Sequence, residues 1–504
     1  MSTKWDFSKR LALFNGDSSK LLVDGKWGLE KESQRVTASG ELAMTDHPSA
    51  FGPKLSNPHI TVDFAESQLE LITSPFSTVE GAYEELNHLQ LLVEDELGAE
   101  LLWPLSMPPK LPDEELIPLA KFGDSAEGSE MEVYRTGLSV RYGKKMQMVS
   151  GIHYNFSFGD RLLSFLHAHI GEGKHIRAFT DEMYTAMARN FLRNRWLLIY
   201  LFGASPSIDP TYYSVMCKEL EYIARCFPEC CATIANYEKH AVSLRVSRFG
   251  YSQAAQGNPM LIFNNLQEYT SEIRKLLSIK NSKFSRLGTY QNGKKIQLNG
   301  NMLQKESEYY SPIRLKQVTE KGESQLDALD KRGVQYAEVR IIDLNPFHKL
   351  GVDLNQLYFL QVFMIYCLLE DSEKILVADA QTMNRNHHLV SLLGRKPNLK
   401  LYPYNNKRPI RLQEWAEELF CKLRSLAVVM DTADNSDKYY DSNKGHNNKY
   451  YDSVEQEYNK VLDPALLPSA RIRKEMKDDK ESYLDFGVRW AQINKSRRAE
   501  KCKV

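Results

Sequence analysis

The 504-residue chain lacks several features that would place it in common protein classes. Lysine plus arginine equals aspartate plus glutamate, 65 each, so no net charge draws it to nucleic acid or an anionic membrane. Its start lacks a secretory signal, and its longest apolar run, near 359–369, is too short to span a bilayer. We therefore expect a cytoplasmic protein that binds neither nucleic acid nor membrane, and we infer no obligate protein partner.

The chain is also short of metal-binding and nucleotide-binding motifs. Its seven cysteines form no CxxC pair, and small buried thiols are a better interpretation of Cys226, Cys230 and Cys231 than a metal site. The phosphate-binding GxxxxGK[ST] loop is missing, as are a convincing GxGxxG, HExxH and GxSxG. A protein of this kind that uses ATP must hold the phosphates with metal ions between carboxylates and with arginines at the outer oxygens.

Five short segments alternate apolar residues with carboxylate, amide, serine, histidine or arginine side chains. Because successive side chains of a strand point to opposite faces, each segment is predicted to be a half-buried β-strand. They are residues 67–72, 152–157, 242–247, 295–299 and 337–341. A solvated outer face is the commoner explanation for any single segment, but such faces usually carry lysine and threonine. In a shared sheet, one face would be aliphatic core and the other a cavity of metal ligands and phosphate-binding groups.

A sixth segment pairs Glu30 with Glu32 in the same way, although Lys31 on its other face interrupts the apolar pattern. Helices are predicted over 77–103, where Ser77 and Glu80 form a capping-box pattern, and around 178–200 and 352–370. Strands and helices follow one another without a regular βαβ rhythm. This arrangement predicts an α+β fold with a mainly antiparallel sheet.

Two polar segments stand apart from this pattern. Residues 431–453 contain a repeated phrase, DKYYDS and then NKYYDS, and are predicted to form an exposed polar loop. Residues 495–504 are predicted to be a short basic tail. Length alone would suggest about three domains.

A series of motifs resembles the bacterial glutamate–cysteine ligases, also called γ-glutamylcysteine synthetases, from about residue 20 to about 475. The motifs are WGLEKESQRV (27–36), TVDFAESQLELIT (61–73), WPLSMPP (103–109), YRTGL with RYG (134–143), SGIHYNFS (150–157), LFGASP (201–206), SLRVSRFGY (243–251), SPIRLK (311–316), YAEVRIIDLNPF (336–347) and GRKP (394–397). Their order and spacing make the resemblance specific. The resemblance is to the single-function form, because the chain stops where a fused ATP-grasp domain would begin.

The resemblance implies a single catalytic domain over residues 1–504 with a fold like glutamine synthetase and the guanidino kinases. In that fold a curved, mainly antiparallel sheet, wrapped by helices, has a concave active-site face. The implied reaction is the ATP-dependent ligation of the glutamate γ-carboxylate to the cysteine amine through γ-glutamyl phosphate, the first step of glutathione biosynthesis. The implied cofactor is Mg²⁺, with several ions per site and Mn²⁺ as a substitute, and the small-molecule substrates are ATP, L-glutamate and L-cysteine.

The resemblance also implies site residues in this chain. The metal ligands are Glu30, Glu32, Asp63, Glu70, His153 and Glu338. Arg340 and Glu338 are the catalytic pair, and Arg314 with Arg340 would meet the ATP phosphates. The substrate glutamate would be bound by Arg245, Gln147 and Asn155. The substrate cysteine would be bound by Phe64, Tyr134, Arg135, Tyr251 and Tyr310. Taken one by one, these residues would more often be surface charges or packing groups, but all occupy their family positions together.

Two alternative functions stay open. One is a γ-glutamyl ligase of the same fold that uses another amine acceptor, and the aromatic cysteine pocket argues against it. The other is a non-catalytic nucleotide-binding relative, which would be expected to lack a metal carboxylate or Arg340. The sequence does not identify the base that deprotonates the cysteine amine.

Overall fold

A seven-stranded antiparallel sheet forms the centre of the molecule. The computed structural model describes residues 5–217, 220, 237–250, 261–404, 408–435 and 448–497. Six strands pair in the order β2-β3-β1-β5-β9-β8, and β4 pairs with one end of β1. The strands are β1 (Gly25–Val36), β2 (Ile60–Val62), β3 (Gln68–Ile72), β4 (Leu101–Leu102), β5 (Ile152–Phe158), β8 (Ile313–Lys316) and β9 (Tyr336–Ile342). The predicted α+β fold with an antiparallel sheet is confirmed.

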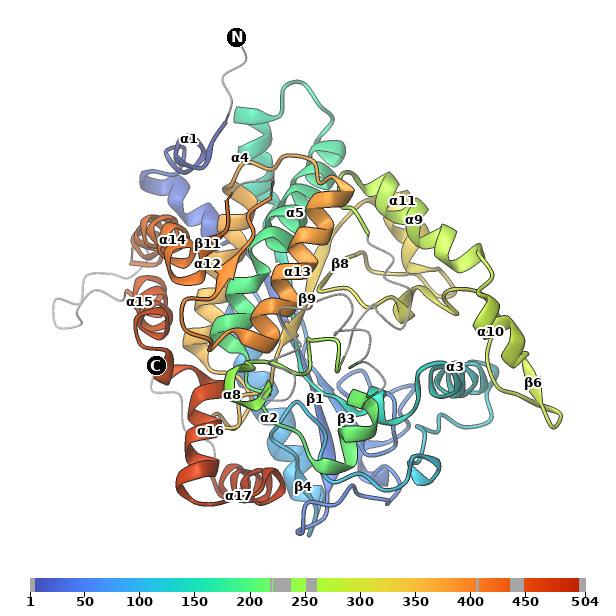
Figure 1. Cartoon of the computed structure of the whole chain (residues 1–504). Coiled ribbons are helices and arrows are strands. Elements are labelled where there is room, and N and C mark those ends of the chain that lie inside the picture. Colours follow the sequence, from blue (N-terminus) through green and yellow to red (C-terminus); the bar gives the residue numbers. More distant parts are fainter. Residues whose placement is uncertain are drawn as a thin grey trace.

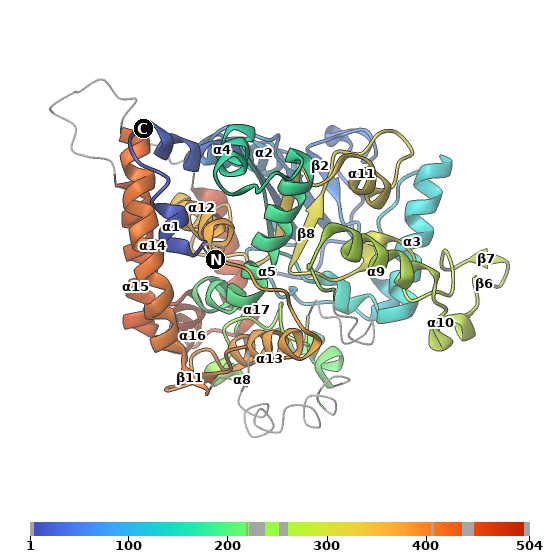
Figure 2. The same ribbon diagram turned by 90° about the horizontal axis from the view of Figure 1, so that it is seen from above.

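Helices cover one face of this sheet in layers. Helix α2 contacts β1 and β3, α5 contacts β8 and β9, and α12 packs against both helices from behind. The helices are α1 (Phe7–Leu11), α2 (Val79–Glu96), α3 (Ala126–Tyr142), α4 (Asp160–Ile170), α5 (Ile176–Phe202), α8 (Tyr237–His240), α9 (Leu266–Ser278), α10 (Ser282–Leu287), α11 (Gln325–Arg332), α12 (Leu354–Leu369), α13 (Val377–Leu393), α14 (Leu412–Asn435), α15 (Lys449–Leu462), α16 (Pro468–Asp478) and α17 (Tyr483–Ser496). Figure 1 shows α5, α12 and α13 beside the sheet. Seen from above, α14 and α15 lie at one end of the molecule and the hairpin of β6 (Tyr290–Gln291) and β7 (Lys294–Lys295) at the other (Figure 2).

Four of the six alternating segments are strands of the main sheet: 28–32 lies in β1, 67–72 covers β3, 152–157 lies in β5 and 337–341 lies in β9. Their apolar side chains, such as Leu29, Leu71 and Val339, are buried. This is what a period of two predicts for a sheet with one face on the core.

The other two strand predictions are wrong. Residues 242–247 form turns with one isolated bridge, and in 295–299 only Lys295 belongs to a strand, in the separate β6–β7 hairpin. The polar side chains explain this, because they bond to nearby backbone: Ser247 Oγ donates to Leu244 O at 2.7 Å, and Gln297 Nε2 donates to Gly288 O at 2.7 Å. Such local bonds offer the backbone an alternative to a strand ladder.

The first predicted helix is real but shorter than 77–103. Its N-cap is Thr78 rather than Ser77, and the Thr78 side chain accepts a hydrogen bond from the amide of Gly81. Helix α2 ends at Glu96, and Gly98 then adopts a positive φ of 56°. That conformation suits glycine and ends the helix, so the chain turns back into β4. The helices near 178–200 and 352–370 are confirmed as α5 and α12.

The prediction of an exposed loop over 431–453 is wrong at both ends. Residues 431–435 complete α14 and residues 449–453 begin α15. Asp431 is buried, and its carboxylate accepts hydrogen bonds from the amides of Tyr450 and Tyr451 at the start of α15. Residues 436–447, most of the basic tail and the three clustered cysteines lie outside the described residues. No helix in the described ranges has the length and apolar character needed to cross a membrane.

Candidate active site

The strand register brings the predicted metal ligands together on the sheet face opposite the helices. Glu32 of β1 lies opposite Glu70 of β3, and Glu30 lies opposite His153 of β5. Asn155 lies opposite Glu338 of β9. All six side chains have the same position in the alternation of their strands. Carboxylate, amide and imidazole side chains from four neighbouring strands thus converge on one region of the sheet, as the residues of a binding site do.

His153 is oriented by the carboxylates around it. Its Nδ1 lies 2.8 Å from Glu30 Oε2, and the amide of Asn155 donates to the other oxygen of Glu30 at 2.9 Å. An ionised carboxylate only accepts hydrogen bonds, so Nδ1 carries the proton and Nε2 keeps a lone pair. This Nε2 is buried, forms no hydrogen bond among the described residues and lies 3.5 Å from Glu32 Oε1. A histidine held in this way is prepared to bind a metal.

Glu338 is surrounded by cations. Arg340 donates a hydrogen bond from Nη1 to Glu338 Oε1. The other carboxylate oxygen, Oε2, is buried without a hydrogen bond in the described structure, and Arg314 Nη1 and Lys316 Nζ each lie 3.9 Å from it. Lys316 was not predicted as a site residue, although it stands two positions after Arg314 on β8 and so shares its face.

The carboxylates of the site differ in their affinity for protons. Burial, followed by repulsion from Glu30 and Asp63, raises the pKa of Glu70 well above its ordinary value. Burial also raises the pKa of Glu32. Burial opposes ionisation of Glu338, but Arg340 and Lys316 hold its pKa well below the usual range. The part of the site around Glu70 and Glu32 therefore has an excess of negative charge that a cation would relieve.

Two groups of side chains have the geometry to hold metal ions. The first consists of Glu30, His153 and Glu338, and the second of Glu32, Glu70 and His153, with the ligand atoms of each group within 4.8 Å of one another. Carboxylate oxygens are the ligands that Mg²⁺ prefers. The histidine nitrogen and the Glu338 oxygen that lack hydrogen bonds fit a bound cation equally well. Asp63, the sixth predicted ligand, lies in the bend after β2 beside this cluster and contributes to the raised pKa of Glu70.

Arg245 lies at the end of β9, beside Gly151, and is only 1% exposed. Its guanidinium donates to the backbone oxygens of Ile342 (3.2 Å) and Arg340 (3.1 Å) and lies 3.7 Å from Asp343 Oδ1. A Cβ atom on Gly151 would come within 2.0 Å of this guanidinium, and the Gly151 amide donates to Glu32 Oε2 at 3.0 Å. Only glycine fits here. Gly151 and Asp343 were not predicted, although both lie within motifs of the family resemblance.

The residues predicted to bind cysteine meet at the edge of the same face. Arg135 donates from Nε to the backbone oxygen of Asp63, and the buried Phe64 follows Asp63 directly. The hydroxyl of Tyr310 donates to Gln147 Oε1 at 3.0 Å. Thus Gln147, which is predicted to bind glutamate, is hydrogen-bonded to one of the residues predicted to bind cysteine. The Nε2 of Gln147 is buried and has no hydrogen-bond partner among the described residues.

Tyr134 completes the described part of this group. Its hydroxyl accepts a hydrogen bond from Ser307 Oγ at 3.3 Å. Burial raises the pKa values of Tyr134 and Tyr310, so both hydroxyls stay protonated at neutral pH. Tyr251, the remaining predicted residue, lies outside the described residues.

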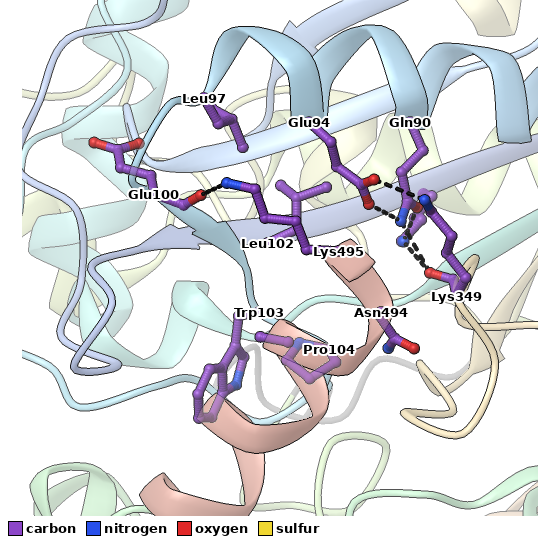
Figure 3. Close-up of a pocket in the computed structure, with 12 residues that line it drawn as sticks. Gln90, Glu94, Leu97, Glu100, Leu102, Trp103, Pro104, Lys349, Asn494 and Lys495 are labelled. Carbon is purple, nitrogen blue, oxygen red and sulfur yellow. Dashed lines mark hydrogen bonds and ion pairs between the residues drawn. The ribbon is translucent and has the colours of Figure 1, made fainter. Parts of the chain in front are cut away.

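The opposite face of β1 explains the lysine that interrupted its apolar pattern. Lys31 is 4% exposed and donates to Gln90 Oε1 of α2 and to the backbone oxygen of Lys349 at 3.3 Å. Glu94 accepts from Gln90 at 2.8 Å and pairs with Lys349 Nζ at 2.7 Å. Figure 3 shows this network between α2 and the segment after β9. The lysine thus belongs to a buried polar network under α2, which sequence periodicity does not detect.

Comparison with solved structures defines the class of protein. The glutamate–cysteine ligase of Francisella tularensis in complex with AMP matches with a TM-score of 0.81 and 33% identity, over 94% of this chain and 90% of that one. A bifunctional glutathione synthetase from Pasteurella multocida matches with a TM-score of 0.74 and 27% identity, over 97% of this chain and 54% of that one. The fold is therefore that of a ligase.

Sequence comparisons identify the family. The model of the glutamate-cysteine ligase family matches residues 11–390. A glutamate–cysteine ligase of Clostridium acetobutylicum is 50% identical over 97% of this chain and 99% of the relative, and one of Pseudomonas putida is 39% identical over 97% and 89%. The chain belongs to the glutamate–cysteine ligase family and is an enzyme of that class.

Proposed function

We propose that the carboxylate-lined face of β1, β3, β5 and β9 is where this enzyme joins the γ-carboxylate of glutamate to the amine of cysteine at the expense of ATP, the first step of glutathione biosynthesis. The observation that carries this assignment is the meeting of the buried Glu32 and the half-buried Glu30 and Glu70 around His153, whose Nε2 lacks a hydrogen bond in the described structure. Such a cluster is unfavourable by itself and becomes favourable when cations bind.

We propose Mg²⁺ as the cation, with Mn²⁺ as a substitute. Glu32, Glu70 and His153, through its Nε2, would hold one ion, and the carboxylates of Glu30 and Glu338 would contribute to a second, with Asp63 beside them. A bound Mg²⁺ neutralises phosphate oxygens and orients them for in-line transfer. The small-molecule substrates would be ATP, L-glutamate and L-cysteine, and a cytoplasmic location remains a prediction.

ATP would reach this face from the edge formed by β8. A cavity of about 290 Å³ lies between β8, α9 and α11, with apolar walls from Tyr269, Ile273 and Leu326. Arg314 and Lys316 line its inner rim and lie beside Glu338. The volume is near the lower end for small-molecule sites, ~300 Å³. The adenine ring of ATP would occupy this cavity, while Arg314 and Arg340 would contact the phosphates.

A carboxylate is a poor electrophile, so the glutamate γ-carboxylate must first be activated. It attacks the γ-phosphorus of ATP, releasing ADP and forming γ-glutamyl phosphate, and the neutral cysteine amine then displaces phosphate. Phosphoryl transfer depends mainly on positioning and charge neutralisation. Arg340, oriented by Glu338, is the residue best placed to meet the transferred group. Gln147 and Tyr310 lie where the two amino-acid substrates would meet.

The decisive experiment measures phosphate release with ATP and glutamate across a panel of amines. Release should require a divalent metal, stop in excess EDTA and be fastest with cysteine. Thr319→Trp, at the exposed rim of the cavity beside β8, should raise KM for ATP and leave KM for glutamate unchanged. Turnover that persists in EDTA would contradict the metal assignment, and a clear preference for another amine would favour the alternative ligase.

A further inference from the structure

A buried arginine on α5 carries a positive charge that no carboxylate among the described residues balances. Arg195 is 3% exposed, and it forms no ion pair among the described residues. Its Nε donates to His387 Nδ1 at 2.9 Å and its Nη2 donates to Asn384 Oδ1. Burial lowers its pKa to about 10, so the guanidinium is still charged at neutral pH. A buried charge of this kind is costly unless it is compensated.

The neighbouring His387 does not balance the positive charge of Arg195. Because His387 accepts the bond from Arg195 at Nδ1, its proton is on Nε2, which lies 2.6 Å from the backbone oxygen of Val246. His387 is therefore a neutral ring held between two partners. Burial, together with the charge of Arg195, lowers the pKa of His387 to about 3, so the ring stays neutral in the physiological range.

Arg195 lines a cavity of about 30 Å³ between α5, α13 and the segment before β8. That volume exceeds the ~10–15 Å³ needed for one water-sized occupant. Among the residues that the structure describes, no acidic one lines it, and most of its walls are apolar, from Leu192, Phe263, Ile375 and similar residues. Asn384 also lines it, and since its Oδ1 accepts from Arg195, its amide NH₂ is the group left to donate.

We propose that this cavity binds a halide-sized monovalent anion, held by the guanidinium of Arg195 and the amide of Asn384. Two donors and a described lining without an acidic residue favour an anion over a cation, and the volume suits one small occupant. The apolar walls favour weakly hydrated ions such as chloride or bromide over phosphate, because the ion must leave water to enter. The site is separate from the carboxylate-lined face.

The position of the cavity connects it to the acceptor end of the active site. Tyr309, Ser311 and Pro312 form part of its wall, and Tyr310 between them donates to Gln147. The backbone oxygen of Pro312 also accepts from the amide of Arg340 at 3.0 Å. A bound anion would stabilise this segment. We therefore expect chloride to lower KM for cysteine while leaving KM for ATP unchanged.

Bromide is the probe that locates the ion directly. Crystals of the wild-type enzyme grown in potassium bromide should show an anomalous-scattering peak beside Arg195 and Asn384. In solution, potassium chloride should raise Tm by about 1 °C above potassium gluconate at equal ionic strength, if the dissociation constant is about tenfold below the chloride concentration. A crystal without a peak in this cavity would overturn the proposal.

Substitutions connect the effect to the cavity. Arg195→Met should abolish the chloride-specific rise in Tm, and Asn384→Leu should reduce it. The control is Arg411→Gln, because Arg411 is an exposed arginine paired with Glu414, and this variant should keep the full rise. An equal rise in wild type and Arg195→Met would contradict the site. If Arg195→Met does not fold, the bromide peak in the wild-type crystal decides. None of these outcomes depends on the assignment of the metal ligands.

Discussion

The two faces of strand β1 bury charged groups in opposite ways. On one face, Lys31 is enclosed by Gln90, Glu94 and Lys349, and these side chains satisfy one another. On the other face, Glu30 and Glu32 meet further carboxylates, and buried atoms of the site have no hydrogen bonds among the described residues.

This difference separates a structural network from a binding site. Native proteins satisfy nearly all of their buried polar groups, so a concentration of unsatisfied ones requires an explanation. The Lys31 network needs nothing more to be complete, whereas we propose that cations and substrate complete the carboxylate face. Adjacent residues of one strand therefore differ in function because of their partners, although their burial is similar.

The strongest test replaces one glutamate on each face. Glu70→Gln or Glu338→Gln removes a charge that the site uses on ligand binding, so kcat should fall on the order of 10²-fold or more. Glu94→Gln is the matched control, since it weakens the Lys349 ion pair in the structural network. It should lower Tm and leave kcat within about threefold of wild type. Steady-state kinetics and thermal unfolding in the same buffer check both results. Equal losses of kcat in the variants of both faces would contradict the distinction between a structural network and a binding site.

A second test separates the two arginines near β9. Arg340→Lys keeps the charge but loses the planar fork that can hold two oxygens, so kcat should fall about 10-fold or more with little change in KM for glutamate. Arg245→Lys should raise KM for glutamate and also lower Tm, because Arg245 donates to two backbone oxygens of β9. The reverse pattern would show that their proposed roles are exchanged.

A third test measures how the stability of the metal-free enzyme depends on pH. Burial lowers the pKa of Lys31 from 10.5 to about 7, so between these values the unfolded chain binds more protons and stability rises with pH. Burial raises the pKa of Glu70 well above 4.5. Between 4.5 and this raised pKa the folded chain binds more protons than the unfolded chain, so stability falls as pH rises. Each slope is at most about 1.4 kcal/mol per pH unit.

Thermal unfolding in EDTA across this pH range measures both slopes. Lys31→Met should remove the rise above about pH 7, and Glu70→Gln should reduce the decline above about pH 4.5. Each variant serves as the control for the other, because the two residues lie on opposite faces of the sheet. Unchanged slopes in both variants would show that neither group titrates as its surroundings indicate.

Much of this site could be predicted from the sequence, because period-two alternation reports both the strand and the face. Alternation predicts that Glu70, His153 and Glu338 lie on polar strand faces, and the family resemblance adds their assignment, with Glu30, as metal ligands. Register was not predictable, since it depends on which strands become neighbours.

Alternation failed where side chains bond locally. Arg245 has the same pattern as His153, yet Ser247 bonds to the backbone within a turn, and the arginine contacts the end of β9 from outside the sheet. The Lys31 network was also missed, because its partners Gln90 and Lys349 are distant in sequence. Neither a buried ion network nor a turn held by serine hydroxyls leaves a periodic signal.

The smallest expected effect concerns the acceptor end of the active face. Tyr310→Phe removes a hydroxyl that donates to Gln147 and should raise KM for cysteine about 2- to 10-fold, the scale of one hydrogen bond, ~0.5–1.5 kcal/mol. Tyr290→Phe is the control, because Tyr290 is exposed on β6, and it should change nothing. If the pocket recognises size and polarity rather than sulfur, 2-aminobutyrate should cost ~1–2 kcal/mol relative to cysteine. Serine, which must bury a hydroxyl, should be worse, and ammonia, which fills no pocket, should be nearly inert. Initial rates with each acceptor test this order, and ammonia reacting as fast as cysteine would exclude an acceptor pocket beside Tyr310.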